Sequence, residues 1–464
     1  MTRRILCSPS VTATSMALAA LLSAMAAASS SPSPLRAQDP QDELPGVRLG
    51  LVYENAYVPA LGIQRFTGRF GGDAVAAEVE AIVAQDLDFS DRFQVVDSLP
   101  VQASDDEIDY QLWDRLGATW VVKGRVEGAG TNSYVLVVEL HDVLYATVAQ
   151  VGQFPLPNPE AGGADFRMAV HRASDRVVEW VFGEPGMAAS RIAFAMTRND
   201  GSKEIYVVDS DGRNLRQITE HDDITNSAVW SPDGTRIAYM TYDADGQRIY
   251  EQNLVTGELR RIDVLRDGNY MTPAYFPDGS SISFAVHGGS RSGIFMWDLE
   301  RQCCLTKLTE SAADDMSPTV SPDGRWLAFN SNRLGTSIPQ IYVMETTGGG
   351  TPQLLSPYQF GQSGYFSAPD WSPFGDNVAF HGRVGRTGRF HILVARMGEG
   401  RRLLQLTFEG NNEAPAWAPD GRHIVFRGER DWGKGLFIVD TASGRIRPVL
   451  VGVDIDDPDW SGPM

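Results

Sequence analysis

The stretch Ser231-Pro232-Asp233-Gly234, followed by Ile237-Ala238-Tyr239, decides the fold because its pattern recurs through the second half of the chain. Proline followed by Asp-Gly favours a tight reversal, and the apolar triplet after it favours a short buried strand. The corresponding turns occupy residues 276–279, 321–324, 372–375 and 418–421. All of them keep Pro-Asp-Gly except the turn at 372–375, which has Phe374 in place of aspartate.

The apolar strands after these turns recur at the spacing of propeller blades. The first such strand, Ile192-Ala193-Phe194, has no preceding turn, and the intervals between successive strands are 45, 45, 45, 51 and 46 residues. Each unit also contains a Pro-x-Trp-like strand, an alternating strand such as Ile341-Tyr342-Val343-Met344, and a closing strand. Four antiparallel strands in each of six units predict an all-β, six-bladed β-propeller of WD40-like (PD40) repeats.

The ring of blades should be closed by a strand from the end of the chain. The first unit lacks a Pro-x-Trp-like strand, and one without a unit, Pro458-Asp459-Trp460-Ser461, follows the sixth unit. We expect this C-terminal strand to pair with the first unit. Closure removes an exposed strand edge, which otherwise favours aggregation.

Residues 46–185 mix helical and strand periodicities and predict an α/β domain before the propeller. Strands are expected at 47–53, 93–96, 120–126, 134–140 and 145–154, and helices at 73–87, 105–116 and 165–182. Asp73 is a candidate N-cap for the first helix. Glu184-Pro185-Gly186 is typical of a hinge, so we divide this part of the chain into domains at 46–185 and 186–464.

The first 37 residues have the three parts of a secretory signal peptide: basic Arg3-Arg4, an apolar run over 11–28, and Ala37 before Gln38. A membrane anchor is the rival interpretation, but the apolar run ends in a Ser/Pro cluster, which favours cleavage after Ala37. An acidic leader at 38–45 then precedes the α/β domain. We therefore expect an exported, periplasmic protein that is not inserted in a membrane after cleavage.

The charge of the chain excludes nucleic acid as its main partner. The 464 residues carry a net charge of −19, which becomes −22 without residues 1–37 because that segment holds three arginines and no acids. Such an acidic surface repels a polyanion. The three cysteines cannot form a disulfide scaffold, and we interpret the adjacent Cys303 and Cys304 as strand residues on opposite faces rather than as a disulfide.

No catalytic pattern stands out in the sequence. The seven histidines are scattered, and the patterns HExxH, CxxC and G-x-S-x-G are absent. The stretch Asp243-Ala244-Asp245-Gly246 is more typical of a plain turn than of a calcium loop. We therefore predict no catalytic residues, no cofactor and no metal site, and a protein that is not an enzyme.

The loops before the Pro-x-Trp-like strands should surround one mouth of the central channel, because the strand order repeats in every unit. Their candidate binding residues are Asp222, Asp223, Asn269, Tyr270, Met271, Asp314, Asp315, Met316, Asn411, Asn412, Glu413, Asp454 and Asp456. The longest interval adds a Gly-rich loop with the aromatic residues Tyr358, Phe360, Tyr365 and Phe366. Aromatic anchors beside charged residues are typical of a protein-binding surface, although these rings could equally pack on their own blade.

A signal peptide, a small α/β domain and six Ser-Pro-Asp-Gly blades in this order resemble the TolB family of the Tol–Pal system. The resemblance extends over about residues 46–464 and includes the segments 82–87, 93–97 and 116–124 of the α/β domain. It implies a periplasmic scaffold that binds the peptidoglycan-associated lipoprotein (Pal) through the propeller mouth and TolA through its N-terminus. Such a scaffold supports outer-membrane integrity and constriction during cell division, and we expect a monomer.

The same resemblance places the TolA-binding strand at 47–53, so the candidate contacts are Val47, Arg48, Leu49 and Leu51. At the propeller mouth, the match to the family is one of position and not of residue identity. The alternative function is an exported propeller enzyme or a carbohydrate-binding module. An enzyme should have histidine, arginine and carboxylate side chains that converge in the channel, and no such set is visible in the sequence.

Overall fold

The computed structural model describes residues 58–96, 107–130, 133–159, 163–264, 267–335, 337–357, 364–383, 388–398 and 402–464, and the backbone of Arg48–Leu49. The signal peptide, the acidic leader and the candidates Val47, Leu51, Tyr358 and Phe360 lie outside these residues. The signal cleavage site and the domain boundaries therefore stay predictions. Within the described part of the chain, no helix is both long and apolar enough to cross a membrane.

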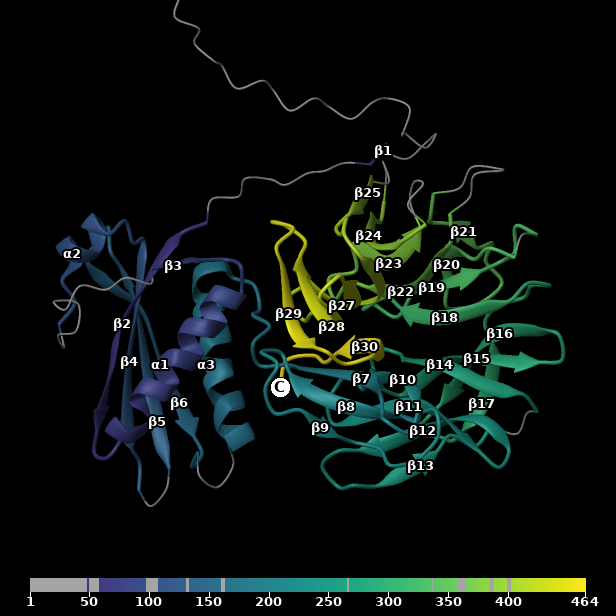
Figure 1. Cartoon of the computed structure of the whole chain (residues 1–464), viewed down its shortest axis with the longest axis horizontal. Helices are drawn as coiled ribbons and strands as arrows, with labels where there is room; N and C mark the ends of the chain where they lie inside the picture. The colour runs from purple at the N-terminus through teal and green to yellow at the C-terminus, as the bar shows by residue number, and fades with distance from the viewer. Residues whose placement is uncertain are drawn as a thin grey trace, which may run out of the picture. The chain divides into compact units, whose positions relative to one another are not determined.

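The α/β domain is a five-stranded sheet with the strand order β3-β2-β4-β5-β6. Its elements are β2 (Ala60–Arg69), α1 (Asp73–Phe89), β3 (Gln94–Val96), α2 (Tyr110–Arg115), β4 (Trp120–Gly128), β5 (Tyr134–Asp142), β6 (Thr147–Leu156) and α3 (Gly163–Phe182). β2 runs parallel to β3 and β4, whereas β4, β5 and β6 pair antiparallel. Figure 1 shows α1 and α3 against the sheet. Their buried apolar side chains share one core with those of the sheet.

The strand β2 was not expected from the sequence, although it lies inside the sheet. Its apolar alternation is interrupted by Gly62 and Gln64, and both residues accommodate Trp113 of α2. A Cβ atom at Gly62 would lie 2.3 Å from the Trp113 ring, and the Trp113 indole donates a hydrogen bond to Gln64 at 3.1 Å. The contact with Trp113 therefore accounts for the two residues that interrupt the strand pattern of β2 in the sequence.

The helices begin at slightly different residues from those expected. Asp73 is the first residue of α1 and Gly72 is its N-cap, so the capping role given to Asp73 is wrong. The helix expected from residue 105 starts at Tyr110, because the Asp109 side chain accepts a hydrogen bond from the Leu112 amide and caps it there. Gly117 follows α2 with a φ of 79° and ends the helix as expected.

The propeller consists of six blades of four antiparallel strands each, coloured teal to yellow in Figure 1, as the sequence predicts, and β1 adds a fifth strand to one of these sheets. The first three blades are β30 (Ile455–Trp460), β7 (Arg191–Thr197), β8 (Lys203–Asp209) and β9 (Arg216–Gln217); β10 (Asn226–Trp230), β11 (Arg236–Asp243), β12 (Gly246–Asn253) and β13 (Leu259–Arg261); β14 (Asn269–Tyr275), β15 (Ser281–Gly288), β16 (Arg291–Asp298) and β17 (Cys303–Lys307). The other three are β18 (Asp315–Val320), β19 (Trp326–Ser331), β20 (Gln340–Glu345) and β21 (Gln353–Leu354); β22 (Phe366–Trp371), β23 (Asn377–Arg383), β24 (Phe390–Arg396) and β25 (Arg402–Gln405); β26 (Asn411–Trp417), β27 (His423–Arg430), β28 (Gly433–Asp440) and β29 (Ile446–Val451).

The repeated turns connect the first and second strands of five blades. The glycine of each turn has a φ of 62–79°, a region that glycine enters without a steric penalty. In the turn at Ser231, the serine hydroxyl donates to Asp233 at 2.5 Å and accepts from the Arg236 amide at 2.9 Å. In the divergent turn, Ser372 donates to Asp376 at 2.9 Å, so Asp376 replaces the missing aspartate and leaves Phe374 exposed.

The ring closes as expected, because β30 pairs antiparallel with β7. Ile455 lies opposite Met196 and Trp460 lies opposite Ile192. The Trp460 indole also donates to the Ser190 hydroxyl at 2.7 Å, and Ile455 is fully buried. The first blade therefore takes its innermost strand from the end of the chain.

Two local expectations need correction. Of the strand expected at 47–53 within the α/β domain, the structure describes β1 (Arg48–Leu49), which pairs in parallel with β25 of the fifth blade. Cys303 and Cys304 form a disulfide, so they are not two independent strand residues. The positive φ of Cys304, 67°, turns its side chain away from the alternation of a regular strand.

Candidate functional site at the propeller channel

Each inner strand of the ring contains a β-bulge at the same place. The pairing with the next strand shifts register there in all six blades. The bulge residues have φ values of 44–52° and are Ser227, Thr272, Ser317, Ala368, Ala414 and Asp457. A bulge increases strand twist and redirects the side chains that follow it. The six bulges therefore shape the channel from equivalent positions.

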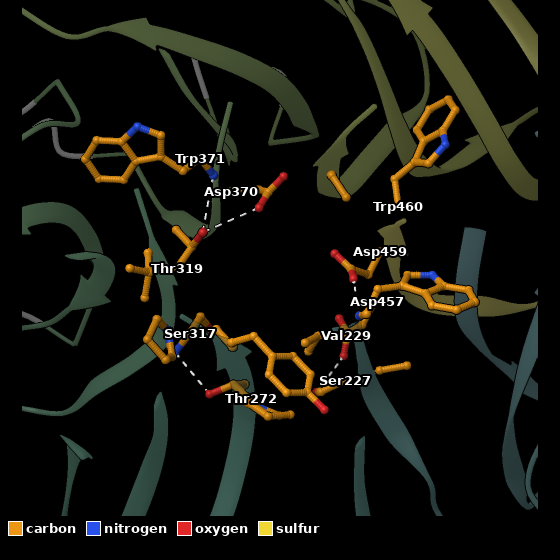
Figure 2. A pocket seen from close by; sticks show the side chains of 18 of the residues that line it. Ser227, Val229, Thr272, Ser317, Thr319, Asp370, Trp371, Asp457, Asp459 and Trp460 are labelled. Atoms are coloured by element: carbon orange, nitrogen blue, oxygen red, sulfur yellow. Dashed lines mark hydrogen bonds between the residues drawn. The ribbon is translucent and has the colours of Figure 1, made fainter. Parts of the chain in front are cut away.

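The inner strands surround a cavity of about 410 Å³. Two residues after each bulge residue, the cavity is lined by Val229, Ala274, Thr319, Asp370, Ala416 and Asp459. Figure 2 shows Thr319, Asp370 and Asp459 on different strands around this space. Three blades therefore present a polar side chain where the other three present an apolar one.

The polar side chains at this position tie neighbouring blades together. Asp459 accepts a hydrogen bond from the Trp230 amide of the next blade at 2.7 Å, and Asp370 accepts one from the Trp417 amide at 2.7 Å. Thr319 accepts a longer one from the Trp371 amide at 3.3 Å. Part of the polar lining of the channel therefore stabilises the contacts between neighbouring blades.

The channel carboxyl groups hold protons unusually well. Burial raises the pKa of Asp370 to about 7. Burial also raises the pKa of Asp459, to about 8, and the neighbouring negative charge of Asp370 adds to this effect. The pKa of Asp457 is raised by burial and by the charge of Asp456. Near neutral pH the channel therefore carries less negative charge than its three aspartates would if all were ionised.

The expected mouth residues divide into two sets by burial. Two residues before the bulge, the side chains are buried, and these include Tyr270, Asp315, Phe366 and Asn412. The next residue in each blade is partly exposed, namely Asn226, Met271, Met316, Ser367, Glu413 and Asp456. We call these six residues the mouth ring. Sequence reasoning missed Asn226 and Ser367, although the fixed spacing from the bulge identifies them.

Several acidic candidates at the mouth are paired with basic side chains. Arg427 lies 3.3 Å from Asp454, 3.5 Å from Asp456 and 3.7 Å from Glu413. Asp222 and Asp223 are exposed, and Asp222 pairs with Arg198 at 2.9 Å. The mouth therefore presents paired charges and not a uniformly acidic surface.

The other loop candidates organise the loops in which they lie. Asp314 accepts hydrogen bonds from the Ser292 amide at 2.9 Å and the Asn332 side chain at 3.0 Å. Asn411 accepts one from the Phe390 amide at 2.8 Å, while Asn269 accepts one from the Gln247 amide at 3.2 Å. These side chains therefore hold neighbouring blades in place as well as lining the mouth.

The described aromatic residues pack largely on their own blade. Phe366 is buried and meets Phe380 edge to face, with ring centroids 5.8 Å apart. Tyr365 is partly exposed and contacts Phe390 at 5.3 Å between centroids. Of the two, only Tyr365 keeps surface that a partner can reach.

One group of metal-binding residue types occurs among the described residues, made of His171 in α3 and Asp209 and Asp211 at the end of β8. All four carboxylate oxygens already accept hydrogen bonds. The donors are Arg191 and Asn214 on Asp209, and Arg167 and the Arg213 amide on Asp211. Because two of these donors are cationic, we assign no metal to this group.

Comparison with known proteins identifies the family to which these domains belong. The family described as "TolB beta propeller domain" matches residues 178–464, which is more than half of the chain. The family described as "TolB amino-terminal domain" matches residues 53–148. This chain belongs to the TolB family.

Individual TolB relatives agree with this assignment. The chain is 31% identical over 195 residues to the Tol-Pal system protein TolB of Methylococcus capsulatus, covering 41% of this chain and 45% of the relative. It is 34% identical over 200 residues to the protein of the same name from Actinobacillus pleuropneumoniae, covering 42% and 46%. The matched segments span less than half the length of these relatives.

A crystal structure of TolB from Acinetobacter baumannii shares the fold. Its TM-score is 0.75 at 24% sequence identity, covering 88% of this chain and 97% of that one. This likeness extends over both the α/β domain and the propeller.

Proposed function

We propose that this TolB-family chain is a non-enzymatic scaffold of the Tol–Pal system, exported to the periplasm by cleavage of residues 1–37. The propeller mouth binds a Pal-like lipoprotein, and the segment with Val47, Arg48, Leu49 and Leu51 binds a TolA-like inner-membrane protein. By joining these partners, the chain supports outer-membrane integrity and constriction during division. Membership of the TolB family and the names of its relatives support this proposal.

The mouth ring is the observation that carries the proposed lipoprotein contact. Met271 of β14 and Met316 of β18 give one side of the ring an apolar, adaptable surface. Glu413 of β26 and Asp456 of β30, paired with Arg427, give the other side a charged one. Apolar contacts next to polar groups suit a folded protein partner better than a small substrate.

The proposed contact is tested by titrating the chain without residues 1–37 with the soluble domain of the Pal-like lipoprotein from the same cell envelope. Replacing both methionines with arginine (Met271→Arg and Met316→Arg) should weaken binding about 100-fold, because two buried apolar contacts become charged. Val255→Arg is the matched control, since Val255 is 78% exposed in the turn after β12. Unchanged binding by the double variant would exclude the mouth ring.

Asp315 is less suitable for this test than its sequence position suggests. It is buried and pairs with Arg333 at 2.9 Å, so its replacement would disturb the blade as well as the mouth. Calorimetric titration gives the affinity, and the melting temperature of each variant shows whether the propeller remains folded. If the folded wild type binds no Pal-like protein but binds an oligosaccharide, the alternative of a carbohydrate-binding propeller is favoured.

The proposed TolA-like contact has a separate test. Deleting residues 38–53 should abolish binding of the TolA-like domain and leave Pal-like binding within about twofold, since the two contacts use different parts of the chain. Retained TolA-like binding by the deletion variant would show that the contact lies elsewhere.

A further inference from the structure

The contact between the α/β domain and the propeller contains two buried histidines in reciprocal positions. His171 belongs to α3 of the α/β domain, and its Nδ1 atom lies 2.8 Å from Asp86 of α1 in the same domain. Its Nε2 atom faces Asp211 of the propeller at 3.8 Å. His171 is completely buried. One imidazole therefore stands between carboxylates from the two domains.

His423 repeats this arrangement from the propeller side. Its Nδ1 atom lies 2.6 Å from Asp420, which belongs to the propeller turn before β27. Its Nε2 atom lies 3.3 Å from Asp91, which follows α1 of the α/β domain. His423 is also completely buried. In both cases Nδ1 points to a carboxylate of its own domain, and Nε2 points to one across the boundary.

Both ring nitrogens of each histidine face carboxylate oxygens, and of these four contacts the one from His171 Nε2 to Asp211 is at ion-pair and not at hydrogen-bond distance. A neutral imidazole has one N–H group and one lone pair, whereas the imidazolium has two N–H groups. If either ring were neutral, with its proton on Nδ1, the Nε2 lone pair would face a carboxylate. The geometry therefore suits two imidazolium ions.

We propose that the α/β domain and the propeller are joined by two reciprocal imidazolium bridges, His171 with Asp211 and His423 with Asp91, so that raising the pH loosens the contact. This inference concerns the protein itself and is independent of the proposed partners. It describes a pH-sensitive contact between the two folded domains.

The charges around His423 favour its protonated form. Burial alone would lower its pKa, but Asp420, Asp91 and Asp440 outweigh burial and raise it above 6.5. On the propeller side, Arg422 pairs with both oxygens of Asp440 and also donates to the Asp91 carbonyl at 2.7 Å. Arg445 donates to the second oxygen of Asp91 at 2.9 Å. These arginines keep Asp91 in place when His423 loses its proton.

The charges around His171 act in the same direction. Burial alone would lower its pKa, but the carboxylates of Asp86 and Asp211 raise it above 6.5 against the opposing charge of Arg167. Three further charged or titratable groups face this cluster: Asp175 of α3, Asp209 of β8 and Arg447 of β29. Burial raises the pKa of Asp175 to about 7.

The sign of the pH effect follows from the raised histidine pKa values. The folded chain holds two protons that the unfolded chain releases near pH 6.5, so the stabilisation is complete below that pH. It is lost as the pH rises through the higher pKa values of the folded chain. Asp175 also favours the folded state at low pH, but it titrates near 7, so histidine variants are needed to isolate the bridges.

The test measures amide hydrogen exchange in the full chain at pH 6 and pH 9. Exchange at residues 88–92 and 209–213 is divided by exchange in β15 of the same sample, which cancels the intrinsic effect of pH. This ratio should rise about tenfold for each unit by which the histidine pKa values exceed 6.5. In the double variant His171→Gln and His423→Gln, the ratio should be high already at pH 6 and change less than about twofold.

His141→Gln is the matched control for this experiment. His141 is a buried histidine that contacts Tyr110 at 2.9 Å and Glu139 at 3.2 Å, all within the α/β domain. This variant should keep the wild-type pH dependence. Equal pH dependence in the wild type and the double histidine variant would overturn the proposal.

A second measurement avoids any folding defect of the variants. In the wild-type chain, the imidazole Cε1–H resonances of His171 and His423 should titrate above pH 6.5 in nuclear magnetic resonance spectra. Titration of both rings at or below pH 6.5 would overturn the proposal even if the double variant failed to fold.

Discussion

The six junctions between neighbouring blades share one backbone geometry but differ in what their channel side chains do. At three junctions Thr319, Asp370 and Asp459 accept hydrogen bonds from the backbone of the next blade. At the equivalent position of the other three blades, Val229, Ala274 and Ala416 cannot accept one. The repeat thus determines where each side chain lies, while residue identity determines whether it joins two blades.

This difference explains why acids line part of the channel. Burial removes the carboxyl groups of Asp370 and Asp459 from water, which raises the pKa of Asp370 to about 7 and that of Asp459 to about 8. Both side chains accept hydrogen bonds from backbone amides that would otherwise be buried without a partner. Leaving such an amide unpaired costs about 1–3 kcal/mol of folding free energy. Their structural role is therefore sufficient to account for their presence, without a bound ligand.

Removing the strand that closes the ring should have the largest effect on the stability of the propeller. Deleting residues 455–464 removes the buried Ile455 and Trp460 and leaves the inner edge of β7 unpaired. Each lost apolar side chain costs about 2–5 kcal/mol, so the propeller should lose its cooperative unfolding transition. Calorimetry tests this expectation, and an unchanged melting temperature would contradict it.

The next largest effect on stability should come from replacing Asp459, which accepts a hydrogen bond from the backbone of the next blade. Asp459→Ala leaves the Trp230 amide without its acceptor and should lower the free energy of unfolding by about 1–3 kcal/mol at pH 7. Asp459→Asn retains an acceptor oxygen and should cost less. Urea unfolding of both variants tests the hydrogen bond, and equal losses would mean that the acceptor oxygen of residue 459 does not carry the effect.

The same aspartates should make the stability depend on pH. Because the folded chain retains protons that unfolded Asp370 and Asp459 release near pH 3.8, wild-type stability should fall as the pH rises from about 4 through 8. The double variant Asp370→Asn and Asp459→Asn should show a clearly flatter pH profile, because each pKa unit of difference between the folded and unfolded chain changes the free energy of unfolding by about 1.4 kcal/mol. Parallel pH profiles for the two proteins would exclude the effect.

The smallest effect on stability is expected at Thr319, the uncharged member of the three side chains that accept a hydrogen bond from the next blade. Thr319→Val removes the acceptor of the Trp371 amide, whose hydrogen bond is longer, and should cost about 1 kcal/mol. Thr319→Ser keeps the hydroxyl and serves as the control. A loss for the serine variant as large as that for valine would assign the effect to packing of the threonine methyl group.

The propeller could be predicted from the sequence because its signals are local. The Pro-Asp-Gly turns recur in four blades and the apolar triplets in all six, and the pairing of β30 with β7 follows from the strand count. At the mouth, the sequence indicates whole loops and does not by itself separate buried from exposed residues. Alternation from the bulge separates buried Tyr270 and Asn412 from partly exposed Met271 and Glu413.

The features that escaped prediction depend on contacts between distant residues. The strand β2 carries Gly62 and Gln64 because the Trp113 side chain packs there. No local pattern in the sequence predicts this contact. Likewise, no spacing in the sequence brings His171 close to Asp211 or His423 close to Asp91. Local periodicity therefore predicts elements, while the partners of single polar residues appear only in the folded chain.

The closing strand also determines the order in which the propeller can form. Trp460 and Ser190, which share a hydrogen bond across the closure, are 270 residues apart in the chain. The hairpins of the other blades join near neighbours, whereas this pairing bears the entropy of closing a long loop and is slow for that reason. During synthesis, the first blade therefore has only three strands until β30 pairs with β7. Factors that shield a strand edge from aggregation would act in this interval.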